Sequence, residues 1–181
     1  DVVLNGPPQI NRPDRPSRFI QDDDYGIRLS AFLGGWDLSV NYLYHYNDRQ
    51  VVRRVFDEFG ALRVNPGYER THLIGGSVSN SFGKATVRVE AGYSTDRFFL
   101  TQDRNDVDGV FQSAAFESVI GLDYPVDSDL FLSAQLFQSY LTRYDPRAAR
   151  SRLENTATFL MTKELWNDTA TIKMQVIHSL D

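Results

Sequence analysis

The sequence has 181 residues, a length that suits one domain, and a formal net charge of −5 from 19 basic and 24 acidic residues. This balance argues against a nucleic-acid binder, which carries a basic patch or stripe, and no stretch is apolar enough for a membrane-spanning helix. The absence of cysteine excludes disulfides and thiolate metal sites and is compatible with an exported protein.

Residues 1–24 hold four prolines and an acidic run, Asp22-Asp23-Asp24, and the sequence predicts an N-terminal loop here. Calcium sites need a spaced set of oxygen ligands, so a lone Asp triplet favours a solvated loop over a cation site.

A β-hairpin is predicted for residues 25–46, where apolar and polar residues alternate on both sides of Gly34-Gly35. Side chains on a strand point to opposite faces with period two, so each strand has one apolar and one mostly polar face. The two glycines can adopt the positive φ angles of a tight turn.

Six further strands are predicted at residues 70–79, 84–94, 111–124, 129–141, 156–163 and 169–180. Short turns join them at 80–83, 125–128 and 164–168. Long polar connections lie at 47–69, 95–110 and 142–155. Strands of about nine to twelve residues have the length of tilted transmembrane strands.

Strict alternation of short turns and long loops is typical of outer-membrane barrels, whereas soluble sandwiches mix their loop lengths. The sequence therefore predicts an all-β fold. The predicted architecture is an antiparallel up-and-down (meander) transmembrane β-barrel section of about eight strands in four hairpins, at residues 25–181. Both ends would lie on the long-loop side, which predicts an internal section of a longer barrel. Full-length pairing between the first and last strands would contradict that.

The charged residues of the polar face are expected to line the lumen and set its selectivity, because a charge on the lipid face costs about 2–4 kcal/mol. These candidates are Arg28, Asp37, Arg88, Glu90, Glu117, Asp123 and Lys173. The open alternative is that Arg28, Arg88, Glu90 and Glu117 only neutralise one another across neighbouring strands.

Aromatic residues gather near the predicted strand ends, where the interfacial girdles of a membrane barrel belong. The expected girdle residues are Tyr25, Trp36, Tyr42, Tyr44, Tyr46, Tyr93, Tyr124 and Trp166. The three histidines, His45, His72 and His178, fall near outer strand ends and do not predict a metal site. No local signature links Ser, His and Asp, so neither an enzyme nor a cofactor is predicted.

Several sequence blocks together resemble a proteobacterial family of outer-membrane β-barrels of unknown function. They lie at residues 25–30, 34–39, 41–46, 68–76, 92–97, 133–139 and 177–180. The resemblance implies a porin-like protein of the Gram-negative outer membrane, surrounded by lipid and lipopolysaccharide. It also implies a small-molecule solute and exporter components of the envelope as partners.

The sequence thus predicts a porin-like channel or transport component for small or hydrophobic solutes. The alternative is a soluble lipocalin-like ligand-binding barrel, and a third option is a structural or adhesive barrel with a plugged interior. The soluble alternative buries seven aliphatic residues that the membrane interpretation exposes as an outer belt: Ile27, Leu38, Val40, Val87, Val89, Ile172 and Met174.

Overall fold

The computed structural model describes residues 9–13, 22–56, 61–103, 106–166 and 169–180. Eight strands form one antiparallel sheet in which each strand pairs with its neighbour along the chain. They are β2 (Tyr25–Leu33), β3 (Trp36–Tyr46), β6 (Arg70–Phe82), β7 (Ala85–Leu100), β8 (Val110–Pro125), β9 (Leu130–Leu141), β10 (Leu153–Leu165) and β11 (Ala170–Ser179). The predicted all-β meander of eight strands is confirmed. Within the described residues, no helix is long and apolar enough to cross a membrane.

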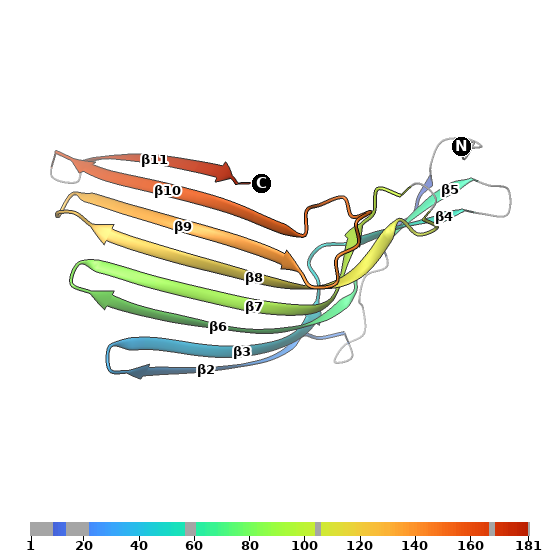
Figure 1. Cartoon of the computed structure of the whole chain (residues 1–181), viewed down its shortest axis with the longest axis horizontal. Helices are drawn as coiled ribbons and strands as arrows, with labels where there is room; N and C mark the ends of the chain where they lie inside the picture. The colour runs from blue at the N-terminus through green and yellow to red at the C-terminus, as the bar shows by residue number, and fades with distance from the viewer. Residues whose placement is uncertain (1–8, 14–21, 57–60, 104–105, 167–168, 181) are drawn as a thin grey trace.

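Tight turns connect the strands at one end of the sheet and long connections at the other (Figure 1). The first turn is made by Gly34 (φ 57°) and Gly35 (φ 85°), a backbone conformation that residues with a Cβ rarely adopt. In the turn before β9, the Asp127 carboxylate accepts hydrogen bonds from the backbone amides of Asp129 (2.9 Å) and Leu130 (2.8 Å). These donors lower the pKa of Asp127.

The long connection at 47–69, expected to be a loop, instead contains two strands, β4 (Val51–Phe56) and β5 (Leu62–Gly67). A short strand from the N-terminal segment, β1 (Gln9–Ile10), pairs in parallel with β5 and completes a second, three-stranded sheet. The loop predictions were wrong at these residues. Valines and Phe56 share β4 with two arginines, so the polar composition hid a strand with β-branched residues.

The second predicted loop, at 95–110, is also shorter than expected, because β7 continues to Leu100 and β8 begins at Val110. A β-bulge between Ser94 and Arg97 shifts the register, and Asp96 within it has a φ of 53°. The extra residue breaks the period-two pattern, which made the end of the strand read as a loop.

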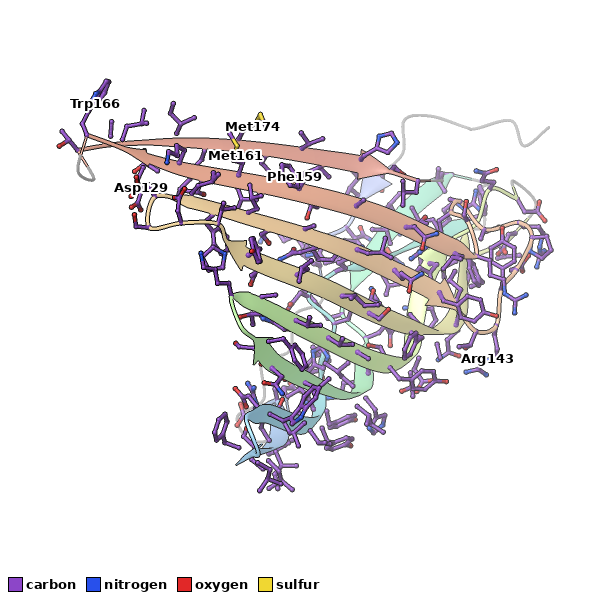
Figure 2. The ribbon with its side chains drawn as sticks, turned by 60° about the vertical axis from the view of Figure 1, so that its left-hand side comes forward. Asp129, Arg143, Phe159, Met161, Trp166 and Met174 are labelled. Atoms are coloured by element: carbon purple, nitrogen blue, oxygen red, sulfur yellow. The ribbon has the colours of Figure 1, made fainter. Side chains whose placement is uncertain are left out.

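Strand register divides the eight-stranded sheet into an apolar face and a polar face. On the apolar face, Val89 lies opposite Val78 and Ile120. The aliphatic and aromatic side chains of this face include Phe159, Met161 and Met174, which lie along β10 and β11 (Figure 2). Figure 2 also places Trp166 and Asp129 at the tight-turn end and Arg143 at the opposite end.

The eight-stranded sheet is a single layer (Figure 1). The accessible surface is 12518 Å², whereas a compact monomer of 20.7 kDa exposes about 8,900 Å². Most of the deeply buried residues lie at the long-connection end, among them Val51, Val110, Ser113, Ala114, Ala115, Leu141 and Ala148. The two outer strands, β2 and β11, form the edges of the sheet and do not pair with each other.

A hollow on the polar face of the sheet

The polar face carries a hollow of about 480 Å³ that reaches from β3 to β10. We call it the main hollow. Because it crosses neighbouring strands of one sheet, the polar face is concave at this point. Its lining includes Asn41, Leu73, Gly75, Glu90, Gly92, Glu117, Val119, Phe137, Ser139, Glu154 and Thr156.

Glycines form part of the floor of the main hollow. Gly75 lies opposite Gly92 on neighbouring strands. A Cβ atom at Gly75 would lie 3.0 Å from the Ala91 carbonyl oxygen and 3.3 Å from the side chain of Asn41. Because these glycines have no side chains, the hollow is deep here, and the side chains of the neighbouring residues form its sides.

A second hollow of about 200 Å³ adjoins the first toward the tight turns. Its lining includes Arg88, Gly121, Asp123 and Gln135, together with three residues that also line the main hollow: Glu90, Val119 and Phe137. These three residues are direct cross-strand neighbours on β7, β8 and β9. They mark the place where the two hollows meet.

The same three residues belong to one row that crosses all eight strands of the sheet. The row reads Ser30, Ser39, Ser77, Glu90, Val119, Phe137, Thr156 and Ser179. The Oγ atoms of Ser39 and Ser77 are 2.7 Å apart, and Arg28 Nη2 donates to Ser39 Oγ at 3.3 Å. Glu90 is the one ionisable residue in this row.

Ion pairs neutralise most charges around the hollows. Arg88 Nη2 lies 2.8 Å from Asp123 Oδ2. Arg97 Nη1 lies 2.8 Å from Glu117 Oε1, and Arg150 Nη2 lies 2.7 Å from Glu154 Oε2. Both of these arginines have their guanidinium carbon 5.5 Å from the centroid of the Phe99 ring. Among the described residues, Glu90 has no ion-pair partner.

All seven predicted lumen residues share the polar face, but the structure brings only four of them together: Arg88, Glu90, Glu117 and Asp123. The other three, Arg28, Asp37 and Lys173, line neither hollow. The alternative in which Arg28, Arg88, Glu90 and Glu117 neutralise one another is wrong in its partners. Arg88 pairs with Asp123, and Glu117 pairs with Arg97, which lies in the segment that the sequence predicts to be a loop.

Sequence reasoning missed several residues of the hollows. Val119 and Phe137 could have been found from strand parity, because they alternate with apolar-face residues as Glu117 does. Glu154 of the lining fell within an expected loop, and so did Arg97 and Arg150, which pair with the lining carboxylates. The longer strands and the β-bulge reveal the positions of Glu154 and Arg97.

The predicted girdle aromatics lie at both ends of the strands. Trp36, Tyr124 and Trp166 are near the tight turns, and Trp36 packs edge-on against Phe82 at 5.9 Å. Tyr25, Tyr42, Tyr44, Tyr46 and Tyr93 lie toward the long connections. There the guanidinium carbon of Arg70 is 4.6 Å from the Tyr44 ring centroid and 4.1 Å from that of Tyr46.

The histidines make local contacts. His72 stacks on Tyr44 at 4.7 Å, and its Nδ1 lies 2.8 Å from the hydroxyl of Tyr42. His45 Nδ1 donates to the Tyr46 carbonyl at 2.8 Å. Within the part of the chain that the structure describes, no three His, Asp or Glu side chains are grouped so that they could hold a metal ion.

Two arginines tie the long connections to one another. Arg54 on β4 donates to the carbonyl oxygens of Asp103 (3.0 Å) and Asp106 (3.1 Å). Arg147 pairs with Asp145 at 2.7 Å and with Asp103 at 3.2 Å. The guanidinium and backbone amide of Arg147 lower the pKa of Asp145 to about 2. The connections at this end therefore form one hydrogen-bonded unit.

Comparison with protein-family models, curated proteins and solved structures finds no match to this chain. The resemblance to a proteobacterial outer-membrane family therefore stays a prediction from the sequence blocks.

Proposed function

We propose that this chain forms part of the wall of an outer-membrane β-barrel. The apolar face meets lipid, and the concave polar face lines a water-filled lumen through which small or hydrophobic solutes pass. The observation that carries this proposal is the opposition of the two faces. One face carries mostly aliphatic and aromatic side chains, and the hollowed face carries most of the ionisable residues of the strands.

The exposure of the aliphatic residues favours this proposal over a soluble lipocalin-like barrel. None of the seven residues that such a barrel would bury is buried. Ile27 is 62% exposed, Val40 63%, Ile172 52% and Met174 45%, and Leu38, Val87 and Val89 are half-buried. A soluble protein rarely leaves a contiguous apolar surface of this extent uncovered.

The dimensions of the apolar face also fit a bilayer. On β8 the face runs from Phe116 to Tyr124 through Ser118, Ile120 and Leu122. Eight residues at about 3.4 Å each span about 27 Å along the strand. A tilt of about 40° reduces that to about 21 Å, near the roughly 25 Å apolar band of outer-membrane barrels.

The ion pairs on the polar face suit a path for solutes better than a catalytic centre. Paired Arg and carboxylate side chains hold fixed charges along the wall, which gives a lumen its selectivity without a reacting group. The proposed mechanism is passive diffusion, with lipopolysaccharide around the wall. Exporter components of the envelope enter this proposal only through the sequence resemblance.

Conductance of the full-length protein in planar bilayers tests the proposed function. We expect discrete current steps in the wild-type protein and smaller steps in Gly92→Trp, because that indole fills the floor of the main hollow. Val89→Trp is the matched control, since Val89 lies on the apolar face of the same strand and lines neither hollow. Silence of the wild-type protein across solutes and voltages would contradict the proposal, and so would equal conductance in both variants.

A further inference from the structure

The polar face carries an apolar strip inside the main hollow. Val119 and Phe137 lie opposite each other on β8 and β9, and Phe137 remains 37% exposed. Leu73 adds its side chain from β6, where its Cδ1 reaches over Gly92. These three side chains offer a ligand an apolar surface beside the charged residues that line the hollow.

Glu90 adjoins this strip and differs from the other ionisable residues that line the hollows. Glu117, Glu154, Arg88 and Asp123 each have an ion-pair partner. Glu90 is exposed and has no such partner among the described residues, and its cross-strand neighbours are Ser77 and Val119. Its carboxylate can therefore accept a cation from a ligand without breaking an existing ion pair.

The size of the main hollow matches a small organic molecule. Its volume of about 480 Å³ falls within the range of roughly 300–1,000 Å³ that ligand pockets occupy. The glycine floor beside Glu90 leaves this space open. Phe137 is 37% exposed and lies in the same row as Glu90, with Val119 between them. A ligand whose cationic group meets the Glu90 carboxylate can therefore place its apolar part on Val119 and Phe137.

We propose that the main hollow is a binding subsite for amphipathic organic cations. The apolar part of the ligand packs on Leu73, Val119 and Phe137, and its ammonium group pairs with Glu90. This deepens the proposed function by naming a solute class. It rests on the proposed function only in treating the polar face as a lumen, because binding itself can be measured without a pore.

Isothermal titration calorimetry of the full chain in a non-ionic detergent tests the subsite with three probes. Phenyltrimethylammonium carries both features, tetramethylammonium lacks the apolar part, and benzenesulfonate reverses the charge. We expect phenyltrimethylammonium to bind about tenfold more tightly than either of the other two. These measurements need only the wild-type protein. The proposal would be overturned if tetramethylammonium bound as tightly as phenyltrimethylammonium, or if benzenesulfonate bound more tightly.

Paired variants then assign the binding to these residues. Glu90→Gln and Phe137→Ala should each weaken phenyltrimethylammonium binding about fivefold to tenfold. Asp37→Asn and Phe32→Ala are the matched controls, because they remove the same groups from the polar face outside both hollows, and they should change binding less than twofold. Unchanged affinity in Glu90→Gln and Phe137→Ala would overturn the subsite.

The two proposals fail separately. Binding of phenyltrimethylammonium without any conductance would support the subsite and contradict the pore. Conductance without a preference among the three probes would support the pore and contradict the subsite.

Discussion

A positive charge placed at the centre of the apolar face gives a quantitative test of the proposed orientation. Ile120 lies midway between Phe116 and Tyr124 on β8 and is 47% exposed. It is four residues from each aromatic, which corresponds to about 14 Å along the strand and about 10 Å of depth at a tilt near 40°. The substitution Ile120→Arg therefore puts a guanidinium near the middle of the proposed apolar band.

The expected cost depends on the medium beside Ile120. In a bilayer, an arginine at the midplane costs about 2–4 kcal/mol, falling to roughly 0–1 kcal/mol near the interface. In water, a substitution at an exposed position changes stability by about 0.5 kcal/mol or less. Thr158→Arg is the matched control, because Thr158 lies on the polar face of β10.

Equilibrium denaturant unfolding in lipid vesicles, followed by the fluorescence of Trp36 and Trp166, measures this difference. We expect Ile120→Arg to lower the free energy of unfolding by about 2–4 kcal/mol and Thr158→Arg to lower it by less than about 1 kcal/mol. A loss below about 0.5 kcal/mol in Ile120→Arg, or equal losses in both variants, would refute the proposed orientation.

Three further predictions concern the connections. Arg54→Ala removes two hydrogen bonds to the carbonyls of Asp103 and Asp106, so hydrogen exchange should accelerate in residues 101–103 and 106–109 but not in β10; unchanged exchange there would contradict this. Gly109→Ala should lower the free energy of unfolding by more than about 1 kcal/mol, because Gly109 has a φ of 74° and an added Cβ would clash with Arg54. Gly83→Ala, with a φ of 62° but open space, should cost less in the same denaturant unfolding assay, and the reverse order would be a contradiction. Because its folded-state pKa is about 2 rather than 3.8, ionised Asp145 stabilises the loop fully above pH 3.8, and this contribution is lost as the pH falls through about 2. NMR shifts of residues 142–152 should follow that transition and lose it in Asp145→Asn; a transition centred at pH 3.8 would be evidence against the Arg147 contact.

The strands of the eight-stranded sheet could largely be predicted from the sequence, because alternation and turn residues are local signals. The first hairpin has the predicted bounds, Tyr25–Leu33 and Trp36–Tyr46. The hairpin within 47–69 was missed because its arginines made a β-branched segment read as a loop. Its position depends on tertiary contacts such as the Arg54 hydrogen bonds to residues 103 and 106, which no local pattern encodes.

The candidate site was only half predictable. Parity alone places Glu90 and Glu117 on the same face, because side chains alternate along each strand. The ion-pair partners depend on the register between strands and on the β-bulge before Arg97. For the same reason the strip of Val119 and Phe137 emerges only when β8 and β9 are aligned.

Spin-label accessibility in vesicles tests most directly whether the apolar face meets lipid. The sequence has no cysteine, so single labels can be placed without removing native thiols. Labels at Val40, Ile120 and Met174 should be accessible to oxygen and shielded from a water-soluble nickel chelate. Labels at Asn41 and Ser77 should show the opposite. If the chelate reached the labels at Val40, Ile120 and Met174 but not those at Asn41 and Ser77, the proposal that the apolar face meets lipid would be contradicted.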